Sequence, residues 1–196
     1  MRVSIIIANY NYGKYIGATI RSLLTQTMQD YEIIVVNDGS TDISLKILEP
    51  YLDVLRVFTG INQGAIAACN EGFSHAKGQY IVRVDADDYV HKNFLEIESL
   101  LLEENKGFDA VACDYYKVDD KGNRLSRHDA MSEPIACGVM FNRDALFSLG
   151  LYKDGDIWED TKFVKRFAES KRLYNIPLPL YRYRQHENSV TNGGVL

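Results

Sequence analysis

Residues 3–40 decide the fold, and they read VSIIIANYNYGKYIGATIRSLLTQTMQDYEIIVVNDGS. Two short apolar runs, residues 3–8 and 31–36, flank a segment with apolar side chains at helical spacing over residues 15–26. Short apolar runs of this length are typical of strands that are buried on both faces of a parallel sheet. The stretch therefore predicts a strand, a helix and a second strand, joined by a right-handed crossover.

The same alternation continues along the first half of the chain. We expect a helix over residues 43–51, strands over 55–58 and 80–84, and a helix over 64–76. Strands that alternate with helices of this length predict an α/β fold, with a mostly parallel, doubly wound sheet and helices on both faces. In such sheets ligands bind beyond the carboxyl ends of the strands.

The pattern is less regular after about residue 105. A strand is expected over residues 110–118, followed by a polar and mobile loop over 123–134. Further along, the sequence predicts a helix over 162–168 and a strand over 180–184.

The composition excludes several classes of protein. With 46% hydrophobic and 25% charged residues, the chain has the balance of an ordinary globular protein and not of a disordered one. Its formal net charge of −5 gives no overall attraction to phosphates, so we expect no nucleic-acid partner. The three cysteines do not form a disulfide pattern, and no apolar run approaches the roughly 18 residues of a membrane span. We therefore expect a cytoplasmic protein.

A basic segment lies near the C-terminus, with only Glu169 to oppose it. Solvated helix and strand faces explain such a segment, and the alternative is a surface that contacts a diphosphate or an anionic lipid. Peripheral contact with the inner face of a membrane therefore stays open. The cations are Lys162, Lys165, Arg166, Lys171, Arg172, Arg182 and Arg184.

Polar side chains follow each expected strand of the first half, at residues 9–11, 37–40, 62–64 and 85–88. Because the carboxyl ends of parallel strands meet at one sheet edge, we expect these loops to converge. An aromatic ring, a lone carboxylate and a carboxylate cluster could there stack a base, accept its N–H group and hold a metal ion on phosphates.

The sharpest feature is DADD at residues 85–88. Three carboxylates within four residues repel one another unless a positive group lies among them, and Mg²⁺ or Mn²⁺ would supply that charge. The alternative is an acidic turn that caps the helix beginning near residue 92. Asp38 has a similar alternative as an acceptor of backbone N–H groups, and Tyr10 as a packing residue.

Five segments in order resemble the inverting glycosyltransferases of family 2, whose fold is called GT-A. They are SIIIANYNYGKYI, EIIVVNDGSTD, NQGAIAACNEGFSHAKGQYIVRVDADD, WED and YRYRQHENSVT, and they extend from residue 3 to about residue 191. The resemblance implies a single GT-A domain over residues 1–196, with a nucleotide-binding half, 1–105, and an acceptor-side half, 106–196.

The resemblance also assigns the donor site. It implies that Ala8 and Tyr10 line the base pocket and that Asp38 bonds the base. It further implies that Asn70 lies along the donor, and that Asp85 faces the ribose or the donor sugar.

Metal and catalytic roles follow from the same resemblance. It implies that Asp87 ligates the metal and that His186 lies against the metal or the diphosphate. Asp160, beside Glu159, resembles the general base. The alternative for this acidic pair is the N-terminus of a helix.

The resemblance implies transfer of a hexose or an N-acetylhexosamine from a nucleotide-diphosphate sugar, most often a UDP-sugar, to a glycan or lipid-linked acceptor in polysaccharide biosynthesis. An acceptor hydroxyl has a pKa far above neutrality, so a positioned carboxylate must accept its proton. One base suffices for a single displacement with inversion. The alternative is a nucleotide-sugar-binding protein without turnover. A dehydrogenase is disfavoured, since no Gly-x-Gly-x-x-Gly follows the first strand.

Overall fold

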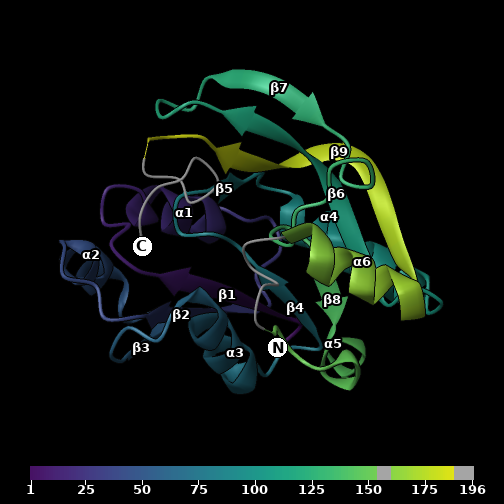
Figure 1. Ribbon diagram of the computed structural model, residues 1–196, viewed down its shortest axis with the longest axis horizontal. Helices are drawn as coiled ribbons and strands as arrows, with labels where there is room; N and C mark the ends of the chain where they lie inside the picture. Colours follow the sequence, from purple (N-terminus) through teal and green to yellow (C-terminus); the bar gives the residue numbers. More distant parts are fainter. Residues whose placement is uncertain (154–159, 188–196) are drawn as a thin grey trace.

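The computed structural model describes residues 1–153 and 160–187, without the side chains of residues 160 and 161. One nine-stranded sheet runs through this described part of the chain. Its strand order is β3-β2-β1-β4-β8-β6-β9-β5, and β7 pairs with β6 outside that path (Figure 1).

The parallel part of the sheet consists of the four strands that the apolar runs predict. They are β1 (Val3–Asn9), β2 (Tyr31–Asn37), β3 (Leu55–Thr59) and β4 (Tyr80–Arg83). β1 pairs in parallel with β2 and with β4, and β2 pairs in parallel with β3. The predicted α/β class, with a doubly wound parallel core, is therefore confirmed.

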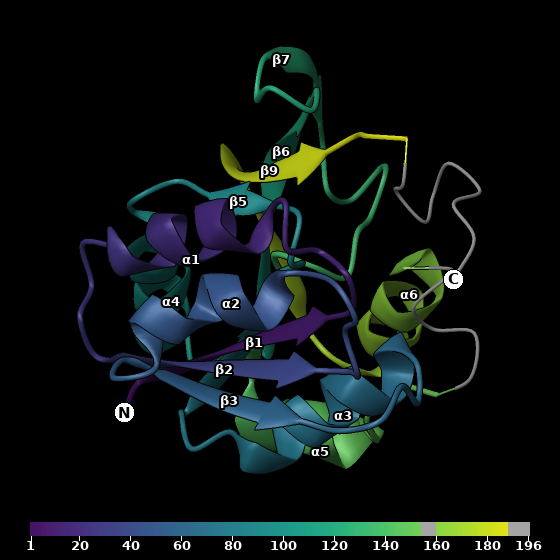
Figure 2. The same ribbon diagram turned by 90° about the vertical axis from the view of Figure 1, so that its left-hand side faces the viewer.

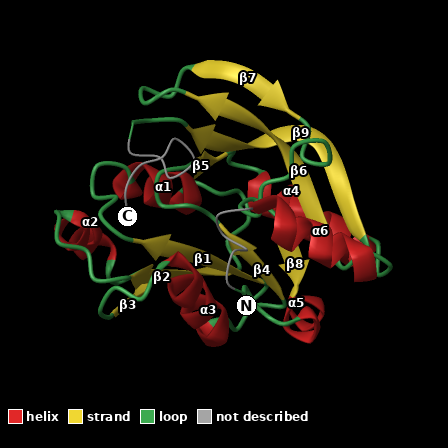
Figure 3. Ribbon diagram, in the orientation of Figure 1, coloured by secondary structure: helices red, strands yellow, loops and turns green. Residues whose placement is uncertain are grey.

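Helices cover both faces of this parallel part (Figure 3). α1 (Ile16–Leu24) packs with Ile5 in the cluster on one face, whereas α3 (Ala65–His75) packs with Ile6 in the cluster on the other. Successive β1 side chains thus enter opposite layers, as strand geometry requires. Gly72 lets α3 lie directly on β1, because a β-carbon at this position would overlap the Ile6 side chain.

The remaining helices are distributed over both halves of the chain. They are α2 (Ser44–Leu48), the 3₁₀ turn η1 (Glu49–Tyr51), α4 (Phe94–Glu104), α5 (Arg143–Leu149) and α6 (Asp160–Ser170). Asp42 supports the start of α2, since its carboxylate accepts the Ser44 amide at 2.8 Å.

The remaining strands extend the sheet with mixed direction. They are β5 (Tyr89–Val90), β6 (Ala110–Val118), β7 (Arg124–His128), β8 (Met140–Asn142) and β9 (Leu173–Arg184). β8 lies antiparallel between β4 and β6 and so joins the two parts of the sheet. β6 and β9 run parallel to each other, and β5 and β7 are antiparallel to their neighbours.

The prediction of a loop throughout residues 123–134 is wrong, because Arg124–His128 forms β7. This strand pairs only with β6 and is exposed along almost its whole length. An edge strand with solvated side chains needs no apolar alternation, so its sequence resembles that of a loop.

Candidate active site

The loops after β1 and β2 lie at the carboxyl edge of the parallel strands (Figure 2), and side-chain hydrogen bonds join them. The Asn9 side-chain amide donates to Asn37 Oδ1 and to Ser40 Oγ, both at 3.0 Å. The Asn11 side-chain carbonyl accepts the Thr41 amide at 2.8 Å. The expected convergence of these two loops is therefore present.

The loop after β4, residues 85–88, is called the acid loop below. Thr19 of α1 holds it from one side, with its hydroxyl 2.8 Å from the Ala86 carbonyl oxygen and 2.7 Å from that of Asp88. The Tyr181 hydroxyl on β9 accepts the Asp85 amide at 3.1 Å and holds it from the other side. The first helix, α1, and the last described strand, β9, thus position the acid loop together.

Asp85 is paired with a cation from its own strand. The Arg83 guanidinium donates Nε–H to one Asp85 oxygen at 2.6 Å and a terminal N–H to the other at 2.9 Å. Arg83 is buried, whereas the Asp85 side chain keeps 29% of its surface exposed. The carboxylate therefore stays accessible at the mouth of the acid loop while the guanidinium fixes its orientation.

Asp87 contacts the predicted metal-site residue His186. His186 Nε2 lies 2.9 Å from Asp87 Oδ2, and the His186 ring stacks on Tyr15 at 4.4 Å between centroids. Burial raises the pKa of the Asp87 carboxyl, hydrogen bonding to His186 lowers it, and the negative charge of Asp85 raises it again. The sequence separates Asp87 and His186 by 99 positions, and the fold brings them together.

Asp88 is the most deeply buried of the three carboxylates. It accepts the Tyr181 hydroxyl at 2.8 Å and the Arg184 amide at 2.7 Å. Burial, followed by the charges of Asp87 and Asp85, raises the pKa of Asp88 well above its usual range. With both oxygens already accepting protein donors, Asp88 supports the loop from inside.

The donor atoms of this site fit a hard divalent cation. Oxygens of Asp85 and Asp88 and the sulfur of Cys137 lie within 4.8 Å of one another. Carboxylate oxygens suit Mg²⁺ and Mn²⁺, an imidazole nitrogen is a usual ligand of transition metals, and a thiol suits softer ions. Asp85 and Asp88 each accept protein donors with both carboxylate oxygens. The metal role expected of Asp87 and His186 stays a prediction, and their contact at 2.9 Å is consistent with it.

Asp38 lies at the same sheet edge with its carboxylate fully engaged. One oxygen accepts the Gln63 amide and the other accepts the Gly64 amide, each at 2.8 Å. These bonds hold the loop that leads into α3. Asp38 therefore accepts backbone N–H groups, as its alternative role required, but from residues 63 and 64 and not from its own turn. Ala8 and Tyr10 are half-buried at the end of β1 and just after it.

Asn70, expected along the donor, holds a distant backbone segment. Its amide donates to the Tyr152 carbonyl at 2.9 Å, and its side-chain carbonyl accepts the Tyr152 amide at 3.1 Å. The Tyr152 ring packs against Phe73 of α3 at 5.4 Å and against Phe163 of α6 at 4.4 Å. Asn70 therefore fixes the residue from which the chain continues toward α6.

Asp160 is the first residue of α6. Its side chain, together with Trp158 and Glu159, lies outside the described residues. For Asp160, the predicted general base, the structure therefore describes only the position of the backbone.

Several contacts of this site were not predicted from the sequence. Tyr15 of the first loop stacks on His186, Arg184 donates Nε–H to the Asp87 carbonyl at 2.7 Å, and Tyr181 bonds Asp88. The sequence names Arg184 only as part of a basic segment. The alternation in YRYRQH would place Tyr181 and Arg184 on opposite faces of a strand, so it gives no signal that both contact the acid loop.

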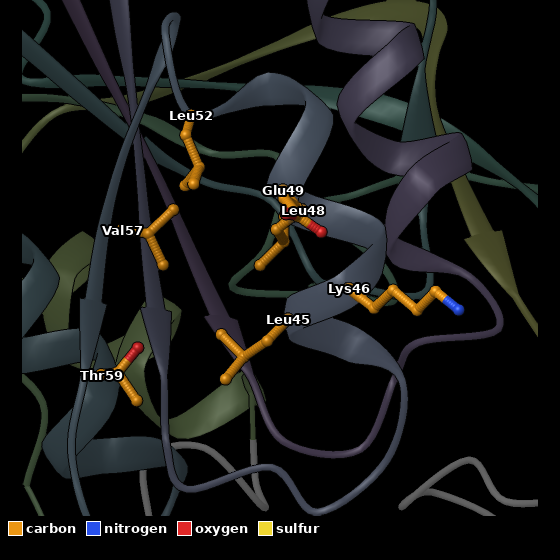
Figure 4. A pocket seen from close by; sticks show the side chains of 7 residues that line it. All are labelled: Leu45, Lys46, Leu48, Glu49, Leu52, Val57 and Thr59. Carbon is orange, nitrogen blue, oxygen red and sulfur yellow. The ribbon is translucent and has the colours of Figure 1, made fainter.

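A shallow hollow lies elsewhere, between α2, η1 and β3 at the outer edge of the sheet (Figure 4). Its lining is Leu45, Lys46, Leu48, Glu49, Leu52, Val57 and Thr59. It contains none of the predicted site residues. Within residues 1–153 and 160–187, every helix is too short or too polar to span a membrane.

The fold and the site define an α/β protein with an acid loop suited to a divalent cation at the carboxyl edge of a parallel sheet. Comparison with known proteins gives the family. The model of Glycosyl transferase family 2 matches residues 4–173. This chain belongs to glycosyl transferase family 2.

Relatives support the assignment along almost the whole chain. The chain is 33% identical to the uncharacterised glycosyltransferase EpsJ of Bacillus subtilis, over 96% of this chain and 62% of that protein. It is 31% identical to glycosyltransferase GlyG of Streptococcus pneumoniae, over 96% of this chain and 72% of that protein. The chain thus spans about two thirds of the length of these relatives.

Solved structures share the fold. S. aureus TarS 1–349 in complex with UDP-GlcNAc superposes with a TM-score of 0.83 at 22% identity, over 100% of this chain and 62% of that chain. Mannosyltransferase PcManGT from Pyrobaculum calidifontis, in complex with GDP-Man and Mn²⁺, gives 0.71 at 19% identity, over 92% and 56% of the two chains. The expected GT-A architecture is therefore confirmed.

Proposed function

We propose that this chain transfers a sugar from a nucleoside-diphosphate sugar to an acceptor hydroxyl, with inversion at the anomeric carbon. UDP is the proposed nucleotide, and a glycan or a lipid-linked saccharide is the proposed acceptor. Membership of glycosyl transferase family 2 supports the reaction class. The pairing of Asp87 with His186, beside the bidentate Arg83–Asp85 pair, is the observation that carries the proposal.

The proposed donor site is the carboxyl edge of the first half, residues 1–105. Ala8 and Tyr10 would line the base, and Asp38 would bond it. Asp85 keeps an exposed carboxylate that can accept hydroxyl groups of the ribose or the donor sugar. The UDP-GlcNAc complex of a protein with this fold supports the choice of UDP.

Asp87 and His186 would hold a divalent cation. When bound, the cation would offset the negative charge that develops on the departing diphosphate. Burial and the negative charge of Asp85 raise the pKa of Asp87. A positive ion beside these carboxylates would lower this pKa. Mn²⁺ in the complex of a protein with this fold supports the type of ion.

Asp160 is the proposed general base, and residues 106–196 form the proposed acceptor side. Its carboxylate would take the proton of the acceptor hydroxyl while that oxygen attacks the anomeric carbon and the bond to the diphosphate breaks. A single base opposite the leaving group is sufficient for inversion.

Thermal unfolding with a panel of nucleoside diphosphates, each with and without Mn²⁺, tests the donor and the metal. A ligand at one hundred times its Kd stabilises the folded state by about 2.7 kcal/mol, which is readily measured. We expect UDP with Mn²⁺ to raise the unfolding temperature most. Equal stabilisation by every nucleotide, or by none, would contradict the proposed donor site.

Asp160→Asn separates turnover from binding. This variant should bind UDP-sugar as the wild type does and should lose transfer by about 10² to 10⁴-fold, the usual range for a general base. Release of UDP from labelled donor, measured beside donor binding, checks this. Undiminished turnover would assign the proton to another group, and binding without turnover in the wild type would favour a nucleotide-sugar-binding protein.

A further inference from the structure

Arg184 at the end of β9 contacts the acid loop through both its backbone and its side chain. Its amide donates to Asp88 Oδ1 at 2.7 Å, and its Nε–H donates to the Asp87 carbonyl at 2.7 Å. Arg184 is 7% exposed. One residue therefore fixes two successive positions of the acid loop.

The other end of the Arg184 guanidinium reaches the turn between β6 and β7. It donates to the Asp120 carbonyl at 2.8 Å and lies 3.5 Å from the Asp119 carbonyl. The guanidinium also lies over the rings of Tyr15 and Tyr89, at 5.4 and 5.3 Å. Arg184 thus joins the acid loop to a turn that is more than 30 residues away in the sequence.

A second set of contacts connects the same turn to the acid loop through the loop before α1. The Asp120 carboxylate accepts the Tyr15 hydroxyl at 2.6 Å and pairs with Lys14 at 2.8 Å. Tyr15 in turn stacks on His186, which contacts Asp87. The acid loop, the loop before α1 and the β6–β7 turn are therefore mutually braced.

Arginine is required at this position because of its shape. A planar guanidinium can donate in several fixed directions and can lie flat between two aromatic rings, whereas a lysine ammonium is a single flexible point charge. The partners of the guanidinium are carbonyl oxygens of the backbone, so it holds main chain and leaves the Asp87 carboxylate oxygens available. Lysine would keep the charge but could not reach both loops at once.

We propose that Arg184 is a positioning residue that fixes the backbone of Asp87 and Asp88 against the β6–β7 turn, and thereby sets the Asp87 carboxylate for a divalent cation. The metal part of this proposal rests on the proposed function. The bracing itself does not, because its contacts are made within the protein alone.

Amide hydrogen exchange of the metal-free protein tests the bracing. Arg184→Lys should speed exchange of peptides covering residues 85–90 and 119–123 by about tenfold, because the side-chain hydrogen bonds that join these two segments are lost. Arg182→Lys is the matched control: Arg182 is equally buried on β9, but its guanidinium donates to carbonyls of Pro179 and Tyr181. Unchanged exchange in Arg184→Lys, or equal acceleration in Arg182→Lys, would overturn the proposal.

Titration with Mn²⁺ alone, followed by the electron paramagnetic resonance signal of the free ion, tests the metal part. Loss of support around a metal ligand usually weakens affinity by about 10 to 100-fold, so we expect that loss for Arg184→Lys and wild-type affinity for Arg182→Lys. Equal affinity in the two variants would overturn the metal part. If the wild type itself took up no Mn²⁺, the proposed metal site would fail, whereas the exchange experiment would still decide the role of Arg184.

Discussion

Two loops that carry carboxylates lie at the same edge of the sheet, and their carboxylates find hydrogen-bond partners in different parts of the chain. Asp38 accepts two backbone amides, at positions 63 and 64, from the loop that follows the next strand of the parallel sheet. The acid loop instead depends on β9 and the residues just after it, since Tyr181, Arg184 and His186 provide its partners from more than 90 positions away.

Asp38 stabilises the parallel core through local hydrogen bonds. The carboxylates of the acid loop, in contrast, meet their partners only when the whole sheet has formed. Bonds between neighbouring loops of the parallel core satisfy Asp38 without any other part of the chain. The acid loop becomes complete only when β9 is in place, and burial and the negative charge of Asp85 still raise the pKa of Asp87 and of Asp88. We therefore expect loss of Asp38 to act on stability, and loss of Asp87 to act on metal binding.

Asp87→Ala is the strongest test of this comparison. Loss of a residue that supports a ligand already costs about 10 to 100-fold in metal affinity, so loss of a ligand itself should exceed about a hundredfold. Mn²⁺-dependent binding of UDP should fall by at least that factor, measured by titration calorimetry. Asp144→Ala, at an exposed carboxylate on α5, is the control. Binding that survives in Asp87→Ala would remove the acid loop from the metal site.

Asp38→Ala should have a smaller effect of a different kind. Two backbone N–H groups lose their acceptor, and each such loss costs about 1 to 3 kcal/mol when the group stays buried. Because the Gln63 and Gly64 amides lie near the surface, we expect about 2 kcal/mol in urea unfolding, with Mn²⁺ affinity unchanged. If Asp38→Ala instead abolished Mn²⁺ binding at wild-type stability, the two loops would not differ as described.

Glu98 extends the comparison to a carboxyl with neither kind of partner. It is fully buried on α4, and neither of its oxygens accepts an N–H or O–H group within the described part of the chain. Burial raises the pKa of Glu98 well above its ordinary value of 4.5, while the nearby Cys113 thiol lowers it.

The direction of the pH dependence follows from this shift. The folded state binds the Glu98 proton more tightly than the unfolded state, so stability falls as the pH rises above about 4.5 toward the raised pKa. In Glu98→Gln this loss of stability with rising pH should be absent. It should unfold like the wild type near pH 4 and be the more stable protein at about pH 8, as measured by urea unfolding. A variant less stable than the wild type at the higher pH would show that the buried carboxyl has an ionic partner.

The parallel core could be predicted because each of its strands is an apolar run of its own. β7 could not be predicted, and of β9 only the end was, as the strand expected over residues 180–184. β7 is a polar edge strand, and β9 runs through Pro177 and Pro179, which usually interrupt a strand. The pairing of β9 with β6 shifts register beside Asp114, where the prolines lie opposite, and this irregularity accommodates their missing N–H groups.

The candidate site was predictable only in part. DADD is local in sequence and identified the acid loop directly. The contact between Asp87 and His186 depends on the full sheet topology, which spacing does not encode, and only the family resemblance suggested it. The roles expected of Tyr10, Asn70 and Asp160 remain predictions, to be tested with donor and acceptor.

Tyr152 connects α3 to α6, and this connection affects how the two helices unfold. Its backbone is bonded to Asn70 of α3, and its ring lies between Phe73 and Phe163. Because one tyrosine shares its contacts between α3 and α6, neither helix can detach without exposing apolar rings of the other. We expect the two helices to open as one cooperative unit, so that limited proteolysis finds either both of them intact or neither.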